Sequence, residues 1–147
     1  MKYEVYQLSY RSESGHLFEF VSIGKRGNIR KRVEFQQTQW SNVFNLAFGD
    51  VDDMGALNDR QVTDNGDMVK VLATIGSVVR EYASRHPERS ILIVGSTPGR
   101  ARLYRMALAL NEEELSAEFG LFTFEGMAKV PFQKGTDIDT FLINLKQ

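Results

Sequence analysis

The first part of the chain alternates hydrophobic and polar residues in the manner of β-strands. Alternation runs through residues 2–10 and 29–35, and residues 17–23 are dense in phenylalanine and β-branched side chains. Residues 24–28 contain two glycines between two of these runs, which predicts a hairpin turn. A further strand is expected at residues 43–48.

The stretch that follows this strand loses its periodicity. Gly49 is expected to end the strand in a turn over residues 49–52, and the polar chain up to Asn65 predicts a long loop. Hydrophobic residues then recur at intervals of three and four, which predicts a helix over residues 67–86. Its apolar stripe consists of Met68, Val71, Leu72, Ile75, Val78, Val79 and Tyr82.

A short apolar strand and a second helix come next. Residues 90–94 contain Ile-Leu-Ile-Val, a run that is typical of a strand in the middle of a sheet. The second helix is predicted over residues 98–115, with Thr97 as its N-cap and Pro98 at the first helical position, where no backbone donor is required. A terminal hairpin is expected at 121–124 and 129–132. Residues 141–146 suit a strand, with a short helix as the alternative.

These elements predict an α+β fold: a mainly antiparallel mixed sheet packed against two helices, about 67–86 and 98–115. A chain of 147 residues is the usual size of one domain, so a single domain over residues 1–147 is expected. There is no cysteine, which excludes disulfides, thiol catalysis and cysteine zinc sites. Without a signal peptide or an apolar membrane span, the chain is expected in the cytoplasm, with no membrane partner.

The net charge of −1 conceals an uneven distribution of charge. Residues 25–32 carry five basic groups, and residues 50–67 carry six aspartates with Arg60 as the only basic residue. The basic hairpin, with Trp40 nearby in sequence, resembles the charge-plus-stacking surfaces that bind single-stranded nucleic acid. The solvated outer face of a sheet has the same composition, and this is the favoured interpretation. The candidate nucleic-acid residues are Lys25, Arg26, Arg30 and Arg32.

The most suggestive segment for chemistry spans residues 95–105, where a small-residue turn leads into a helix start rich in arginine. Free N–H groups at a helix start attract anions, and arginine binds phosphate or carboxylate in a bidentate manner. The candidate ligand-binding residues are Ser96, Thr97, Arg100, Arg102, Tyr104, Asp50 and Asp67. In the structural alternative, Thr97 is only a cap and Arg100 pairs with an acidic side chain of the 50–67 loop.

Several known motifs are incomplete. The glycine spacing after residue 94 is not that of a P-loop or a dinucleotide site. The acidic run from Asp50 fails as an EF-hand because Met54 and Gln61 stand at ligand positions. His16 and His86 both have structural explanations in turns and helix ends. The sequence therefore predicts no metal site and no cofactor.

Three phrases resemble an uncharacterised family of short bacterial proteins, chiefly from Bacteroidetes. They are Phe-Asn-Leu-Ala-Phe-Gly-Asp at 44–50, Asn-Gly-Asp at 65–67 with Lys-Val-Leu-Ala-Thr at 70–74, and Gly-Ser-Thr-Pro at 95–98 with the following arginines. The resemblance implies no activity, substrate or cofactor. It implies a recurring surface at 49–52, 65–67 and 95–102, with Asp50 and Asp67 facing Arg100 and Arg102 in an ion-pair network or an open polar site.

Three functional hypotheses follow. The first is a binding module for a phosphate-bearing ligand, with nucleic acid as the first choice. The second is a small phosphodiester-processing or nucleotide-modifying enzyme of the toxin-like kind, with Asp50 or Asp67 as base. The third is a homodimer or protein-interaction partner that uses an aromatic sheet face. Binding demands least of the sequence and is the main expectation; the sequence leaves open whether the protein is an enzyme.

Overall fold

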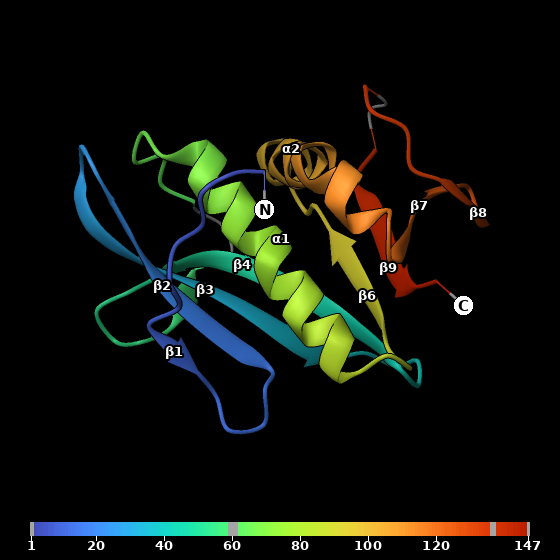
Figure 1. The fold of residues 1–147 in the computed structure, drawn as a ribbon, viewed down its shortest axis with the longest axis horizontal. Coiled ribbons are helices and arrows are strands. Elements are labelled where there is room, and N and C mark those ends of the chain that lie inside the picture. The colour runs from blue at the N-terminus through green and yellow to red at the C-terminus, as the bar shows by residue number, and fades with distance from the viewer. Residues whose placement is uncertain (1, 59–61, 136–137, 147) are drawn as a thin grey trace.

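The computed structural model describes residues 2–58, 62–135 and 138–146. These residues form a nine-stranded, mixed and mostly antiparallel sheet with helices α1 (Met68–Arg85) and α2 (Pro98–Leu115) in front of it in the view of Figure 1. The α+β class predicted from the sequence is confirmed. The strands are β1 (Tyr10–Arg11), β2 (Leu17–Gly24), β3 (Gly27–Gln37), β4 (Val43–Val51), β5 (Leu57–Asn58), β6 (Ser90–Val94), β7 (Phe119–Glu125), β8 (Ala128–Pro131) and β9 (Thr140–Leu145).

The strand order places the apolar strand β6 in the interior of the sheet. The order is β1-β2-β3-β4-β6-β9-β7-β8, and β5 adds a short pairing to β4. Strand β6 runs parallel to β4 and antiparallel to β9, with α1 in the connection between β4 and β6. A helical crossover is the usual connection between parallel strands. The sequence prediction of a central strand at 90–94 is therefore confirmed.

Aromatic side chains fill the core between the sheet and α1. Phe18, Phe35 and Phe48 are almost completely buried, and the ring of Phe35 stacks on that of Tyr82 from α1 with centroids 3.7 Å apart. The two helices meet at Asn111, whose Nδ2 donates hydrogen bonds to the carbonyl oxygens of Leu72 in α1 and Ala107 in α2. This core fixes the relative position of the two helix starts.

The local helix signals in the sequence are confirmed. Thr97 is the N-cap of α2, and its Oγ1 accepts a hydrogen bond from the backbone N–H of Arg100 at 3.2 Å. Helix α1 ends at Arg85, directly before His86 and Pro87. The predicted hairpin turn joins β2 and β3, where Gly27 has a φ of +89° that few other residues adopt. The C-terminal segment forms strand β9 rather than the alternative helix.

Two local predictions are wrong. Of the predicted strand at 2–10, only Tyr10 belongs to a strand, β1, and the backbone N–H of Tyr6 is bound to the Thr74 hydroxyl of α1 instead of a neighbouring strand. The predicted turn at 49–52 starts too early, because β4 continues through Val51 and pairs with both β3 and β5. Gly49 permits this second pairing: an added Cβ would lie 2.2 Å from the carbonyl oxygen of Asn58.

The sheet face opposite the helices has a charged half and an apolar half. Glu19, Arg30 and Arg32 lie on this face in β2 and β3, where side chains alternate with those of the core. In the other half, strand register aligns Leu92, Leu142 and Phe122, all partly exposed. The expectation of a protein partner on an aromatic sheet face concerns this surface, and it stays a prediction.

Candidate functional site

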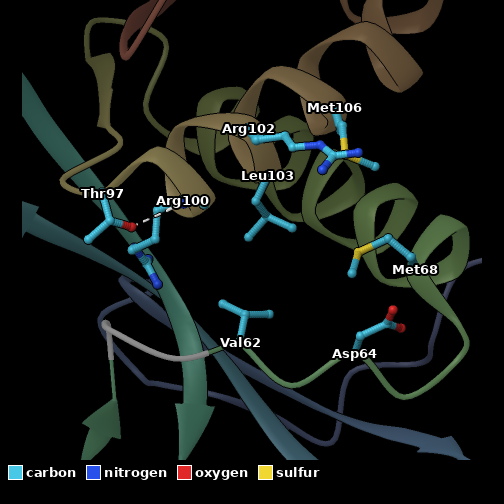
Figure 2. A pocket seen from close by; sticks show the side chains of 9 residues that line it. Val62, Asp64, Met68, Thr97, Arg100, Arg102, Leu103 and Met106 are labelled. Carbon is cyan, nitrogen blue, oxygen red and sulfur yellow. Dashed lines mark hydrogen bonds between the residues drawn. The ribbon is translucent and has the colours of Figure 1, made fainter.

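A cleft of about 670 Å³ opens beside the starts of the two helices. This volume lies within the range of small-molecule sites, roughly 300–1,000 Å³. Figure 2 shows Thr97 and Arg100 on one side of the cleft, Asp64 and Met68 on the other, and Leu103 and Val62 between them. The lining residues are Val62, Asp64, Met68, Thr97, Gly99, Arg100, Arg102, Leu103 and Met106.

The turn between β6 and α2 brings Arg100 to the cleft. Gly95 directly follows β6 and lies so close to the start of α2 that an added Cβ would be 2.3 Å from the Cα of Ala101. Thr97 then caps the helix, and Pro98 occupies its first turn. Because the first N–H groups of a helix have no partner within it, the cleft borders a region of positive potential.

Arg100 is a buried cation without a carboxylate partner among the described residues. Arg100 is only 6% exposed. Nη2 donates hydrogen bonds to the carbonyl oxygen of Phe48 at 2.5 Å and to the Tyr104 hydroxyl at 2.6 Å. Nη1 is buried and has no hydrogen-bond partner in the described part of the chain. A buried charge in this state costs free energy unless an anion compensates it.

Arg102 adds a second positive charge at the mouth of the cleft. It is exposed, and within residues 2–58, 62–135 and 138–146 it makes no ion pair. The structural alternative, in which Arg100 pairs with an acidic side chain of the 50–67 loop, is not observed among the described residues of that loop. Asp64, the one carboxylate among the lining residues, uses Oδ1 to accept the N–H of Gly66 at 2.9 Å.

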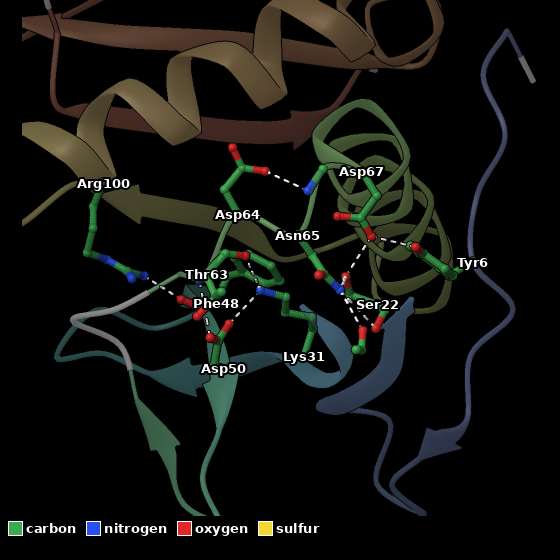
Figure 3. A network of polar contacts seen from close by, with 12 residues as sticks. Tyr6, Ser22, Lys31, Phe48, Asp50, Thr63, Asp64, Asn65, Asp67 and Arg100 are labelled. Carbon is green, nitrogen blue, oxygen red and sulfur yellow. Dashed lines mark hydrogen bonds and ion pairs between the residues drawn. The ribbon is translucent and has the colours of Figure 1, made fainter. Parts of the chain in front are cut away.

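Asp50 lies outside the cleft, in a buried polar network with Lys31 and Thr63 (Figure 3). Lys31 Nζ donates to Asp50 Oδ1 at 2.6 Å and to the Thr63 carbonyl oxygen at 2.9 Å. Asp50 Oδ2 accepts the N–H of Thr63 at 3.1 Å. Both backbone groups of Thr63 are thus held in place, and its neighbours Val62 and Asp64 line the cleft. Asp50 positions one wall of the cleft rather than contacting its interior.

Asp67 belongs to a different network at the start of α1. It is the N-cap residue, but its side chain makes no capping hydrogen bond. Its Oδ2 instead accepts hydrogen bonds from the hydroxyls of Tyr6 and Ser22 (Figure 3). Burial, together with the neighbouring Asp67 carboxylate, raises the pKa of the Tyr6 hydroxyl. Asp50 and Asp67 thus have other partners, and the expected ion pairs between them and Arg100 or Arg102 are not observed in the described part of the chain.

Three of the five cations of the basic hairpin, Arg30, Lys31 and Arg32, form ion pairs, and these pairs share two carboxylates, Glu19 and Asp50. The Glu19 carboxylate forms an ion pair with each of two arginines: Oε1 lies 2.9 Å from Arg30 Nη2, and Oε2 lies 2.7 Å from Arg32 Nη2. Burial opposes ionisation of Glu19, but the hydrogen bonds from both arginines outweigh it and lower the pKa of the carboxyl group. Lys25 and Arg26 remain exposed in the turn. Trp40 follows the far end of β3, so it does not share a surface with this turn.

The predicted ligand-binding residues thus separate: Asp50 and Asp67 lie in the two networks just described, and the others lie around the first turns of α2. Three of the latter line the cleft: Thr97, Arg100 and Arg102. Tyr104 is not a lining residue, but its hydroxyl accepts a hydrogen bond from Arg100. Ser96 lies on another side of the helix start, in a hollow with Asp139. The sequence analysis did not predict the other cleft residues. For Leu103 and Met68 the helical spacing of apolar residues predicted only that they face the core. The missed residues are Val62, Asp64, Met68, Gly99, Leu103 and Met106.

Two other kinds of feature, metal centres and membrane-spanning helices, have no support in the described residues. Within those ranges, no group of three histidine, aspartate or glutamate side chains is placed to hold a metal ion. No described helix combines the length and the apolar character needed to cross a membrane.

The chain matches the model of a known protein family over nearly its whole length. The model of a family of unknown function, DUF6934, matches residues 2–146. The chain belongs to DUF6934. This membership confirms the resemblance to an uncharacterised family that the sequence phrases suggested, over nearly the whole chain. No curated protein and no solved structure matches the chain. The cleft of this DUF6934 member is therefore the feature from which its function is inferred.

Proposed function

We propose that this protein binds a small phosphate-bearing ligand in the cleft beside Arg100. The observation that carries the proposal is the buried guanidinium of Arg100, whose Nη1 has no partner and which faces no carboxylate among the described residues. Isolated buried charges are rare because they lose their hydration without compensation. A bound anion supplies that compensation.

Two further features favour phosphate in particular. Arg102 lies one helical position beyond Ala101 and gives a second guanidinium at the same cleft. Gly99 has open space at its Cα, where a ligand can approach the backbone of the helix start. Two guanidinium groups together with helix N–H donors form the donor set that tetrahedral oxyanions prefer.

A small ligand is favoured over nucleic acid. In the hairpin that suggested nucleic-acid binding, the exposed Arg30 and the part-buried Arg32 both pair with Glu19, and Lys25 and Arg26 are its exposed cations without an ion pair among the described residues. Trp40, the suggested stacking residue, lies beyond the other end of β3. A polyanion needs several cations along one continuous surface. The cleft instead concentrates its positive charge at one concave site.

The enzymatic alternative has less support than binding. Both candidate bases are already engaged, Asp50 by Lys31 and Thr63 and Asp67 by Tyr6 and Ser22. Neither lines the cleft. A general base has to reach the proton that it removes, directly or through one water. We therefore propose binding alone.

The test is calorimetric titration of the protein with methyl phosphate, at fixed ionic strength and with chloride as the reference anion. We expect binding to the wild type and, from the loss of one charge-assisted contact, roughly tenfold weaker binding in Arg102→Gln. Because Arg102 makes no ion pair among the described residues, the unfolding temperature without ligand stays unchanged. The matched control is Arg26→Gln, an exposed arginine outside the cleft, which leaves binding unaffected.

A nucleic-acid arm separates the two ligand classes. Anisotropy of a labelled single-stranded RNA is measured with wild type, Arg102→Gln and a Lys25→Gln/Arg26→Gln variant. Binding of RNA that weakens only in the hairpin variant would replace the proposal with the nucleic-acid hypothesis. Absence of any methyl phosphate binding above the chloride reference, or equal losses in Arg102→Gln and Arg26→Gln, would also contradict it.

A further inference from the structure

Resting on the proposed function, we infer that the ligand is an amphipathic phosphate monoester, whose apolar body lies on the helix-facing wall of the cleft and whose far end is not anionic. Three observations carry this inference: the size of the cleft, the apolar side chains beyond its cationic end, and the place of Asp64. Each restricts a different part of the ligand.

The cleft is far larger than its anion-binding end requires. Arg100 and Thr97 lie on one side of a cleft of about 670 Å³, and the guanidinium of Arg102 lies beside Met106. A phosphate group alone fills only a small fraction of such a site, and ligand sites of this size generally enclose most of an organic molecule. The remaining volume therefore holds the organic part of the ligand.

The wall beside that volume is apolar. Val62, Met68, Leu103 and Met106 line it, and Figure 2 shows Leu103 and Val62 pointing toward each other across the gap. Met106 is 40% exposed although it is large and hydrophobic. Apolar surface in a concave site gains free energy when a ligand displaces its water. Methionine side chains also adapt readily to the shape of a bound molecule.

Asp64 restricts the far end of the ligand. Its carboxylate lies across the cleft from Arg100 in Figure 2, next to Met68. Oδ1 already accepts the N–H of Gly66, and the group forms no ion pair with a described residue. A carboxylate repels a second anion and accepts hydrogen bonds from an amine or hydroxyl. The site therefore selects against bisphosphates and for donors at this end.

The first experiment measures the apolar contribution. Wild-type protein is titrated with n-alkyl phosphates from methyl to hexyl. We expect affinity to rise about two- to fourfold for each CH₂ added while the chain lies on the apolar wall. In Met106→Gln the increment per CH₂ falls, and because the increment is measured against methyl phosphate in the same variant, a change in phosphate affinity does not enter it. The matched control is Met54→Gln, because Met54 is 91% exposed and lies outside the cleft.

The second experiment measures the selection at the far end. In wild type, 6-aminohexyl phosphate is expected to bind at least as tightly as hexyl phosphate, and hexane-1,6-diyl bisphosphate at least fivefold more weakly. In Asp64→Asn this difference between the bisphosphate and hexyl phosphate disappears. Asp64 is exposed and its amide analogue can still accept the N–H of Gly66, so the variant is expected to fold.

The outcomes separate this inference from the proposed function. Binding of methyl phosphate that Arg102→Gln weakens, with no gain on chain extension, overturns the inference and leaves the proposed function standing. Equal increments in Met106→Gln and Met54→Gln, or a bisphosphate that binds best in wild type, overturn it as well. If no phosphate in the series binds, the proposed function fails together with the inference.

Discussion

Lys31 Nζ lies 2.6 Å from Asp50 Oδ1, in an ion pair whose side chains are only 1% and 15% exposed. The pair joins neighbouring strands in register, since Lys31 and Asp50 are partners in the β3–β4 ladder. Both residues also bind the backbone of Thr63, one at its carbonyl oxygen and one at its N–H. The ion pair therefore links the sheet to the segment that lines the cleft.

Removal of one partner of this ion pair is expected to be costly. In Asp50→Ala the ammonium of Lys31 stays buried without its counter-charge, and we expect the free energy of unfolding to fall by about 3 kcal/mol. The double variant Lys31→Met/Asp50→Leu leaves no buried charge and is expected to lose clearly less. Urea unfolding of Asp50→Ala, of the single variants Lys31→Met and Asp50→Leu and of the double variant measures both. A double variant that loses the sum of the single losses would show that the two side chains do not interact.

The ion pairs of Glu19 predict acid sensitivity. Its pKa in the folded protein lies below the usual value of 4.5, so the carboxylate stabilises the fold fully above that value. This stabilisation is lost as the pH falls through the lowered folded pKa. We expect Glu19→Gln to be less stable at pH 7, by about 1–3 kcal/mol, and to show a flatter decline of stability between pH 5 and about 3.

Urea unfolding at a series of pH values tests the role of Glu19. Glu125→Gln serves as the control, because Glu125 is exposed at the end of β7. The same slope in wild type and Glu19→Gln below pH 5 would mean that other carboxylates cause the acid sensitivity.

Asn65 is expected to hold the basic hairpin to the start of α1. It is 1% exposed; its Oδ1 accepts the N–H of Arg26 at 2.6 Å, and its Nδ2 donates to the carbonyl oxygen of Gly27 at 2.9 Å. Asn65→Ala leaves both groups without this partner, and we expect a loss of about 1–3 kcal/mol in stability. Amide exchange at Arg26 should accelerate. Asn28→Ala, an exposed change in the same hairpin, should alter neither measurement by much.

The contact between the two helices at Gly76 predicts that alanine lowers the stability of the protein there, the reverse of its usual effect in a helix. Alanine normally favours a helix over glycine by about 1 kcal/mol. At Gly76, however, an added Cβ would lie 2.4 Å from Cγ and Oδ1 of Asn111, which is fixed between the helices. Gly76→Ala is therefore expected to lower the unfolding temperature and to cost about 1–3 kcal/mol.

Gly99→Ala is the matched control for this helix contact, because open space surrounds that helical glycine. It should leave the unfolding temperature unchanged or slightly raised. In the double variant Gly76→Ala/Asn111→Ala the cost of the added methyl should largely disappear. A Gly76→Ala protein as stable as wild type would show that the helices separate without strain.

Much of the fold follows from local features of the sequence. The spacing of apolar residues predicts both helices, and Thr97-Pro98 predicts where α2 begins, because periodicity and capping involve only neighbouring residues. The apolar run at 90–94 likewise predicts a central strand. Even the buried position of Lys31 has a signal, since it alternates with Val33 and Phe35 on the apolar face of β3.

The charge partners and the cleft depend on tertiary structure. Asp50 pairs with Lys31 because strand register sets them opposite each other, and register likewise sets Glu19 opposite Arg32, with Arg30 two residues away on the same face of β3. No local pattern contains these pairings, since they join residues between 11 and 19 positions apart through backbone ladders. The sequence by itself determined the elements and an arginine at a helix start. Only the packing of α1, α2 and the segment around Thr63 decided that this arginine, Arg100, is buried and borders an apolar cleft. The same packing leaves Arg100 without a carboxylate partner among the described residues. Burial and pairing depend on tertiary structure because they arise from contacts between distant parts of the chain.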